Sequence, residues 1–287
     1  MEPKFVCLDV GGTQIKAASI DKDGHLSEPI QYFPARSGEN AETILDHFIR
    51  IIRQVSEPDA IPALRLAFPG PFDYERGICL MRGLGKYDAL YGLDFGGELG
   101  RRLEIPRDTI RFANDAAAFA LGELHFGAGK GAQRAMFVCI GTGCGSAFAV
   151  NGALVSAPEP GVPENGWIYP TPFLEGQIDD YLSRRGLLAL TQARLGQALD
   201  GKALAQRTRS GEKSAGACFR EFGVRLRDAL SPFLDGFRPE VLCLGGQIMK
   251  SGDLFLEPLE TACLGSGIRL AVTEDTSVRT LQGLTRV

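Results

Sequence analysis

The sequence predicts an α/β fold built from two related halves, and three observations support this. Residues 5–12 form an apolar run that ends in an acid and two glycines, and a second apolar run covers residues 15–20. This pattern indicates a strand, a tight turn and a returning strand. Residues 135–150 repeat the pattern around a turn of glycines and a threonine. A helical pattern and then a β run over residues 40–68 complete a strand–helix–strand unit, which is typical of a parallel α/β sheet.

The individual elements follow from local patterns along the chain. Alternating or continuous apolar runs between turn residues predict strands at 5–10, 15–20, 26–33, 63–68, 77–81, 110–113, 135–140, 146–150, 153–156, 240–244 and 277–281. Apolar residues at helical spacing predict helices at 40–55, 94–103 and 254–263, and further helices and loops between 187 and 214. An alanine-rich helix starts at Asp115, and Phe219, Phe222 and Leu226 lie on one face of another helix, which indicates a core seam.

Length and charge limit the class of protein. A chain of 287 residues with 44% hydrophobic residues is long enough for about two domains. We expect residues 1–115 to form one domain and residues 116–287 the other, with a chain end that can return towards the first. The net charge of −4 gives no reason to expect nucleic acid or an anionic membrane as a partner. No signal peptide or membrane-spanning run is evident, so we expect a soluble, cytoplasmic protein.

The cysteines and histidines do not form a metal-binding pattern. The seven cysteines are scattered and no pair has Cys-x-x-Cys spacing, while the three histidines lie far apart in the sequence. Small buried hydrophobic side chains, kept reduced, are the simpler interpretation. We therefore expect no zinc site.

The first glycine turn is a candidate phosphate-binding loop. Two adjacent glycines can take positive φ and can point amide N–H groups at phosphate oxygens. Asp9, at the end of the strand, can address the accompanying Mg²⁺ through water. An ordinary glycine hairpin is the simpler alternative, and the second such turn in the chain argues against it. The expected cofactor contacts in this segment are Asp9, Gly11, Gly12, Thr13 and Lys16.

A later glycine turn is expected to contact the same polyphosphate as the first. Gly141, Thr142 and Gly143 follow an apolar strand, as the first turn does. Each half of the protein would then bind part of one polyphosphate. A third turn, Gly245-Gly246, ends a buried strand.

Polar residues next to predicted strands are candidates for the chemistry. Asn114 and Asp115 stand at the start of the alanine-rich helix, where capping explains one polar residue better than two. Asp115 is therefore a catalytic candidate. The irregular stretch 82–92 carries Lys86, and a solvated surface loop is the simpler interpretation of that stretch.

The chain resembles the ROK family of sugar kinases, within the hexokinase and actin structural group, over nearly its whole length. The motifs that carry the resemblance are Asp9-Val10-Gly11-Gly12-Thr13-Gln14-Ile15-Lys16, Phe68-Pro69-Gly70-Pro71-Phe72-Asp73, Asn114-Asp115-Ala116 with Gly122-Glu123, Ile140-Gly141-Thr142-Gly143 and Leu244-Gly245-Gly246-Gln247-Ile248. Each is weak alone, and their common order makes the resemblance specific. The resemblance implies a duplicated ribonuclease H-like fold with an interdomain cleft and, by analogy, a homodimer.

The resemblance also implies a reaction. Asp115 would accept the proton of a sugar hydroxyl that attacks the γ-phosphate of ATP, with Mg²⁺ between the phosphates. Asn114 would hold adjacent hydroxyls, and Gly70 belongs to the sugar-side loop. The resemblance also implies that the Gly245-Gly246 turn approaches the adenosine ribose or the phosphates. ATP and Mg²⁺ are thus the expected cofactors, and a small sugar is the expected substrate.

Departures from the family pattern concern the sugar site. Glu164-Asn165-Gly166 is followed by Trp167, where the family usually has a zinc-linked histidine, and residues 168–178 contain no cysteine. Packing of Trp167 is favoured over stacking on a sugar face. Asp179 stands where the family has a sugar-binding glutamate that is one methylene longer. Gly83 replaces an expected asparagine, and Lys86 could bind a hydroxyl-rich or acidic sugar.

Two alternatives remain at the level of sequence. ROK repressors share this body but carry a preceding DNA-binding helix-turn-helix, and the early start of the first strand, by Phe5, disfavours that interpretation. A sugar-binding protein without turnover is the second alternative, and intact Asp9, Asp115 and both glycine turns argue against it. The sugar, the hydroxyl and the choice between ATP and polyphosphate stay open.

Overall fold

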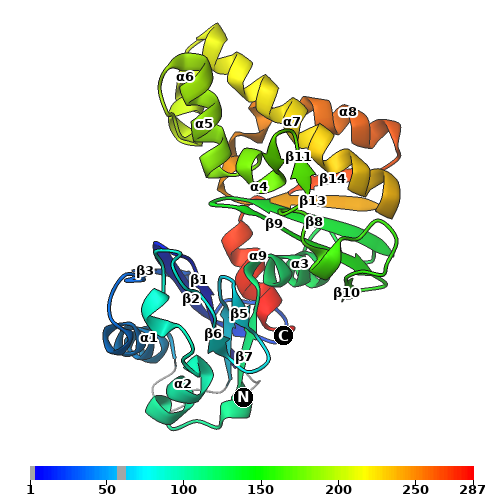
Figure 1. Ribbon diagram of the computed structural model, residues 1–287. Coiled ribbons are helices and arrows are strands. Elements are labelled where there is room, and N and C mark those ends of the chain that lie inside the picture. The colour runs from blue at the N-terminus through cyan, green and yellow to red at the C-terminus, as the bar shows by residue number, and fades with distance from the viewer. Residues whose placement is uncertain (1–3, 57–62) are drawn as a thin grey trace. The chain divides into compact units, whose positions relative to one another are not determined.

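The computed structural model describes residues 4–56 and 63–287, and the chain divides into two compact units (Figure 1). The first unit contains the chain up to Phe126 together with Ser277–Val287, and the second contains Gly127–Thr276. This division differs from the expected boundary between residues 115 and 116. The whole of helix α3, Asp115–Phe126, belongs to the first unit, and so does most of the last helix.

The first unit is built on a mixed five-stranded sheet in the order β3-β2-β1-β4-β7. β1 pairs antiparallel with β2 and parallel with β4, which in turn pairs parallel with β7. A separate two-stranded hairpin, β5–β6, follows β4. The strands are β1 (Lys4–Val10), β2 (Gln14–Asp21), β3 (Gln31–Pro34), β4 (Leu64–Ala67), β5 (Phe72–Asp73), β6 (Ile78–Cys79) and β7 (Ile110–Ala113). The main helices are α1 (Ala41–Val55), α2 (Phe95–Leu103), α3 and α9 (Thr276–Leu284).

Alternation along β1 assigns the helices of this unit to the two faces of its sheet. Val6 and Leu8 belong to a core cluster that contains the apolar residues of α1 and α2. Cys7, between them in the sequence, belongs to a second cluster with residues of α3 and α9. Because successive side chains of a strand point to opposite faces, both faces of the sheet are covered.

Small residues allow α3 and α9 to pack closely. A Cβ at Gly283 would overlap the carbonyl oxygen of Ala118, and one at Gly122 would overlap the carbonyl oxygen of Arg279. The two helices therefore meet backbone to backbone. This contact explains why the chain end belongs to the first unit.

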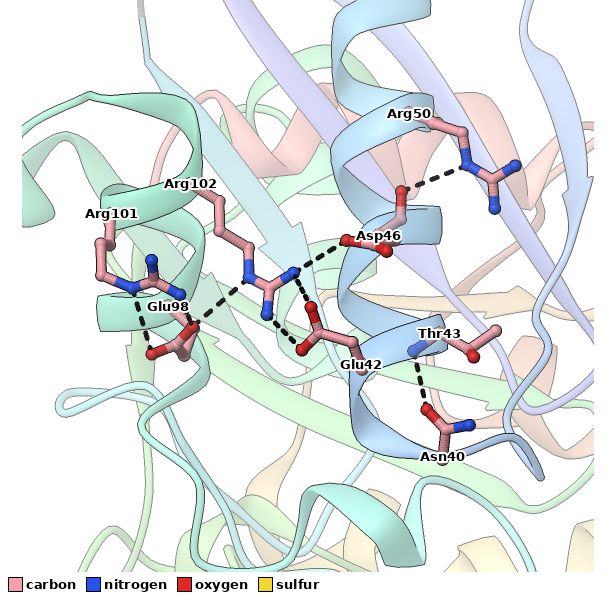
Figure 2. A network of polar contacts seen from close by, with 8 residues as sticks. All are labelled: Asn40, Glu42, Thr43, Asp46, Arg50, Glu98, Arg101 and Arg102. Atoms are coloured by element: carbon pink, nitrogen blue, oxygen red, sulfur yellow. Dashed lines mark hydrogen bonds and ion pairs between the residues drawn. The ribbon is translucent and has the colours of Figure 1, made fainter.

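Arg102 of α2 links α2 to α1 through a network of ion pairs (Figure 2). Its guanidinium binds Glu42 and Asp46 on α1 and Glu98 on its own helix. Glu42 is 70% exposed, so solvent screens these pairs and each contributes little to stability. The network mainly orients α2 against α1, whose N-cap is Asn40.

The second unit repeats the topology of the first. Its five-stranded sheet has the order β10-β9-β8-β13-β14, with antiparallel pairs on the β9 side and parallel pairs on the β13 side. The two sheets thus have the same strand order and the same directions, which confirms the predicted duplication. The strands are β8 (Arg134–Ile140), β9 (Cys144–Val150), β10 (Ala153–Val155), β13 (Val241–Gly245) and β14 (Arg269–Val272), with a small hairpin of β11 (Pro172–Phe173) and β12 (Gly176–Gln177).

Five α-helices of the second unit gather on one side of its sheet (Figure 1). They are α4 (Ile178–Tyr181), α5 (Arg184–Leu195), α6 (Gly201–Arg209), α7 (Lys213–Phe237) and α8 (Glu257–Gly265). Phe219, Phe222 and Leu226 of α7 are fully buried in the core, as their helical spacing predicted.

One predicted element has the wrong type. Residues 277–281 were expected to form a final strand, but they lie within helix α9. The edge strand of the second sheet is instead β14, in the preceding segment. Leu281 and Leu284 lie on the buried face of this helix, so the apolar residues here follow helical and not strand spacing.

No helix in residues 4–56 and 63–287 is long and apolar enough to cross a lipid bilayer.

Candidate active site

The first glycine loop connects β1 to β2 at the end of β1. The Gly11 amide donates a hydrogen bond to the carbonyl oxygen of Gln14 at 2.9 Å, which closes the loop. A Cβ on Gly11 would lie 2.9 Å from the same oxygen, so close backbone approach requires glycine there. Neither Gly11 nor Gly12 has positive φ, so the expected reason for these glycines was wrong.

The loop leaves two amides free and places one ion pair beside them. Within the described residues, the N–H groups of Gly12 and Thr13 have no hydrogen-bond partner, whereas that of Gly11 is used inside the loop. Asp9, the residue before Val10, forms a 2.7 Å ion pair with Lys16 across the strand pair. A carboxylate, an ammonium and free amides are thus gathered at one strand end, which is where open α/β sheets bind ligands.

The segment after β6 contacts the first glycine loop through Tyr87, although most of residues 82–92 are exposed, as expected of a surface loop. Tyr87 is fully buried, and its hydroxyl donates a 2.9 Å hydrogen bond to the carbonyl oxygen of Gly11. Ser37 donates from its hydroxyl to the Gly12 carbonyl oxygen at 2.6 Å. Burial raises the pKa of the Tyr87 phenol well above its usual range, so the phenol remains a donor. The two hydroxyls therefore hold the glycine loop through the carbonyl groups of Gly11 and Gly12.

Asn114 and Asp115 stand at the end of β7, where helix α3 begins. The Ala116 amide donates to the side-chain oxygens of both residues at 2.9 Å. The Asn114 amide group also donates to the Tyr74 hydroxyl at 3.2 Å, and this hydroxyl donates in turn to the Phe68 carbonyl oxygen at 3.1 Å. The loop after β4 and the start of α3 are therefore joined through Tyr74.

Gly70 belongs to the same cluster. A Cβ on Gly70 would lie 3.3 Å from the Tyr74 hydroxyl oxygen, and the Gly70–Pro71 peptide bond is cis. The first unit thus brings together the ends of β1, β4 and β7 with the candidate residues that the sequence assigned to them. Those candidates are Asp9, Gly11, Gly12, Thr13, Lys16, Gly70, Lys86, Asn114 and Asp115.

The pKa of Asp115 is raised above its ordinary value. Desolvation by surrounding protein is the largest cause, and the negative charge of Asp9 is the second. The Ala116 amide and the Lys86 ammonium oppose the shift. The residue as a whole is nevertheless exposed. An exposed residue whose carboxyl has a raised pKa can accept a proton from a ligand hydroxyl near neutral pH.

The second glycine loop, between β8 and β9, has the same construction as the first. The Gly141 amide donates to the Gly143 carbonyl oxygen at 2.9 Å, and the Arg184 amide donates to the Gly141 carbonyl oxygen at 2.8 Å. In the described part of the chain, the N–H groups of Thr142 and Gly143 have no hydrogen-bond partner. Here too the glycines have ordinary negative φ.

Asp179 of α4 supports this second loop. Its Oδ1 accepts a 2.7 Å hydrogen bond from the Cys144 amide, and its Oδ2 pairs with Arg185 at 3.0 Å. A Cβ on Gly143 would lie 2.9 Å from Asp179 Oδ1. The carboxylate is therefore already engaged on both oxygens, and its expected role in sugar binding stays a prediction.

The third glycine turn packs on the same loop. Gly246 has φ of +100°, and a Cβ there would overlap the carbonyl oxygen of Ile140, so only glycine fits. Its amide donates to the Thr276 hydroxyl at 2.8 Å. Gly245 ends β13 directly beside Cys139 of β8. The strand ends of the second unit thus carry Gly141, Thr142, Gly143, Gly245 and Gly246 together.

Glu164 lies in a short 3-10 helix, Glu164–Gly166, against β9. The Ser146 hydroxyl of β9 donates to the Gly166 carbonyl oxygen at 2.7 Å and accepts from the Ile168 amide at 2.9 Å. Glu164 is exposed, and within the described residues its carboxylate has no hydrogen-bond partner, while its carbonyl oxygen accepts from the Trp167 amide at 3.1 Å. Its role as a sugar ligand stays a prediction.

The sequence profile of the ROK family matches residues 5–268. The chain belongs to the ROK family. A glucokinase of Thermotoga maritima is 24% identical over 277 residues, which cover 89% of this chain and 86% of that protein. A ROK glucokinase of Streptomyces griseus, solved with glucose and AMPPNP, superposes with a TM-score of 0.78 at 20% identity, covering 99% of this chain and 98% of that one. A ROK transcriptional regulator, a homologue of the Escherichia coli Mlc protein, superposes with a TM-score of 0.80 at 16% identity over 99% of this chain and 78% of that chain.

This ROK chain contains the hairpin β11–β12 in the segment where the family resemblance implies a zinc cluster. The Phe173 and Tyr181 rings meet edge to face at 5.6 Å, and Arg225 lies over the Tyr181 ring. The Gln177 amide donates to Asp180 at 3.1 Å. Aromatic packing and a capping carboxylate thus brace this hairpin, and no group of three or more potential metal ligands occurs in the residues described.

Trp167, at the position of the family histidine, is half-buried and not a core residue. Its ring lies 5.9 Å from that of Tyr169, which is 39% exposed. Trp167 was expected to brace this segment by packing in the core. The contacts of the β11–β12 hairpin brace it instead.

Sequence reasoning missed Ser37, Tyr74 and Tyr87 near the strand ends of the first unit and Arg185 near those of the second. Tyr74 and Arg185 reach partners six residues away, Phe68 and Asp179. Ser37 and Tyr87 reach the first glycine loop from much farther along the chain. Ser37 is 25 residues from its partner and Tyr87 is 76 residues from its own, so no local pattern could have identified them.

Proposed function

We propose that this ROK chain is an ATP- and Mg²⁺-dependent sugar kinase in which Asp115 is the general base. One observation carries the proposal: a carboxyl with a raised pKa stands at the end of β7, in the same unit as a glycine loop with two free amides. The similarity of this chain to glucokinases, and the AMPPNP bound to one solved relative, support a nucleotide-dependent reaction.

The proposed step is an in-line phosphoryl transfer. A sugar hydroxyl oxygen forms a bond to the γ-phosphorus of ATP while the bond from that phosphorus to the β–γ bridging oxygen breaks. The electron pair of the broken bond leaves with ADP. The hydroxyl proton passes to Asp115, and Asn114 hydrogen-bonds neighbouring hydroxyls of the sugar. Gly70 and Glu164 are the further sugar contacts in this proposal. The sequence also predicts Asp179 and Lys86 as sugar contacts, but both oxygens of Asp179 are already engaged and the Lys86 side chain runs along Gly12 of the first glycine loop.

The free amides of the two glycine loops are the proposed phosphate contacts. They belong to Gly12, Thr13, Thr142 and Gly143. The amides of Gly11 and Gly141 close their own loops, so these two residues would contribute by shape and not as donors. Fixed N–H dipoles stabilise charge as it develops without reorganising during the reaction.

Asp9 is the residue that would approach Mg²⁺, through water. Lys16 holds one of its oxygens, and the other has no hydrogen-bond partner in the described residues. A single carboxylate fits this metal, because Mg²⁺ in phosphate sites keeps several waters and takes its remaining ligands from the phosphates. When bound, the metal neutralises phosphate charge.

The test is a coupled assay of ADP release with MgATP over neutral, N-acetylated and acidic sugars. Asp115→Asn is expected to bind the accepted sugar and to lose turnover by at least about 10²-fold, because positioned general bases contribute that much. Retained turnover in this variant would remove Asp115 from the proposed role. The same assay with polyphosphate identifies the donor.

A sugar-binding regulator without turnover is the second candidate. It is favoured by the superposition on a ROK transcriptional regulator. Absence of ADP release with every sugar, together with a sugar-dependent rise in melting temperature, would establish that candidate instead.

A further inference from the structure

Lys86 is held on a rigid segment that is docked on the first glycine loop. The Asp88 carboxylate accepts hydrogen bonds from the amides of Leu84 and Gly85 at 3.0 and 2.9 Å. The Tyr87 amide donates to the Ser37 carbonyl oxygen at 2.7 Å. Tyr87, next to Lys86, is the buried residue whose hydroxyl holds Gly11. The backbone of Lys86 is therefore fixed on both sides and tied to the loop itself.

The side chain of Lys86 runs along Gly12. Its Cδ lies 3.4 Å from the position that a Cβ on Gly12 would take, so its methylene stem covers the loop in ordinary contact. The residue is half-buried, yet its ammonium has no hydrogen bond or ion pair within residues 4–56 and 63–287. An ammonium without a partner, on a stem that covers a loop with free amides, can form a charge-assisted hydrogen bond to a bound anion.

The charges nearby indicate which anion that is. Asp9 is already paired with Lys16. Asp115 is close enough to Lys86 for the ammonium to lower its pKa, but the two form no ion pair. The Lys86 side chain thus covers the glycine loop with its stem and lies near Asp115, the candidate general base. The sugar-side residues Gly70 and Asn114 are joined instead through Tyr74.

We propose that the Lys86 ammonium binds the phosphoryl group that is transferred, and not a carboxylate of an acidic sugar. This inference rests on the proposed kinase function. As the bond from the sugar oxygen to phosphorus forms and the bond to the leaving ADP oxygen breaks, negative charge is spread over the phosphoryl oxygens. A cation that is already positioned by its own loop stabilises this charge.

The experiment compares Lys86→Met, which keeps the apolar stem, with Lys86→Arg, which keeps the charge. The control is Lys22→Met, because Lys22 is exposed in a turn at the far end of β2. Calorimetric titrations with AMPPNP and with ADP, both with Mg²⁺, measure whether the γ-phosphoryl contact is lost. Steady-state kinetics with glucose, or with the best sugar of the panel, separate kcat from KM.

Lys86→Met is expected to lower kcat about 10²-fold, the usual effect of losing one donor to transition-state charge, with little change in KM for the sugar. Its affinity for AMPPNP should fall about tenfold or more while its affinity for ADP changes little, since a charge-assisted hydrogen bond is lost. Lys86→Arg should restore part of both losses. Because Lys86 lowers the pKa of Asp115, the acid limb of the pH–rate profile should also move to higher pH in Lys86→Met.

Other outcomes overturn the inference. A raised sugar KM with unchanged kcat would make Lys86 a sugar contact, and equal losses of AMPPNP and ADP affinity would place it away from the γ-phosphoryl group. If the wild-type protein phosphorylates no sugar, the proposed function fails, but the comparison of AMPPNP with ADP still decides the role of Lys86. A wild-type protein that binds neither nucleotide would remove both proposals.

Discussion

The buried hydroxyl of Tyr87 gives the sharpest prediction about the first glycine loop. Tyr87→Phe keeps the ring, its packing and its burial, and removes only the 2.9 Å hydrogen bond to the Gly11 carbonyl oxygen. Deleting one partner of a buried hydrogen bond costs about 1–3 kcal/mol, because the carbonyl oxygen is left unsatisfied. We expect the free energy of unfolding to fall by that amount and the KM for ATP to rise.

Urea unfolding followed by circular dichroism measures the change in stability, and hydrogen–deuterium exchange of residues 10–14 measures the loop itself. Tyr91→Phe is the matched control, because Tyr91 lies four residues away and is 52% exposed. Exposed substitutions of this kind change stability by less than about 0.5 kcal/mol. Equal stability and equal exchange in the two variants would refute the inferred support of the loop by Tyr87.

Three further variants test the other parts of the site. Because the fold raises the pKa of Asp115, the stability associated with this group is present at low pH and is lost as pH rises through the folded-state pKa. Asp115→Asn should therefore raise the melting temperature relative to wild type at neutral pH but not near pH 3. A difference in melting temperature that stays the same across a pH series would contradict this. Gly246→Ala should destabilise the second unit by roughly 2 kcal/mol or more, because its Cβ overlaps the Ile140 carbonyl oxygen at φ of +100°, whereas Gly141→Ala meets open space and should cost far less in thermal denaturation. Asp179→Ala should release the second glycine loop and raise KM for ATP more than KM for the sugar, and steady-state kinetics with the reverse result would assign this carboxylate to the sugar.

Part of the site was readable because its signals are local. A strand that ends in Asp-x-Gly-Gly predicted the hairpin around Gly11 from consecutive residues, and the repeat around Gly141 revealed the duplication. Asn114 and Asp115 were identified because two polar residues stand between a strand and a helix. The resemblance to the ROK family could be drawn from these same motifs, and the match over residues 5–268 confirms it.

The reasons why the residues matter were less accessible to sequence. Positive φ was expected at the phosphate-loop glycines, and close approach of backbone oxygens is the actual constraint at Gly11. The segment 82–92 has no periodic pattern, so it was interpreted as a surface loop although Tyr87 is fully buried. The last helix was predicted as a strand, because a short apolar spacing does not distinguish the two.

The sequence by itself determined the strand ends, the glycine turns and the acids that stand beside them, because each depends on a few consecutive residues. The tertiary structure alone decided which distant side chains hold those turns. Tyr87 reaches back to Gly11, and Asp179 reaches back to Cys144, through single hydrogen bonds over 76 and 35 residues. Such bonds form only after the sheets have brought their strand ends together, and a lone polar side chain carries no periodic signal of its partner.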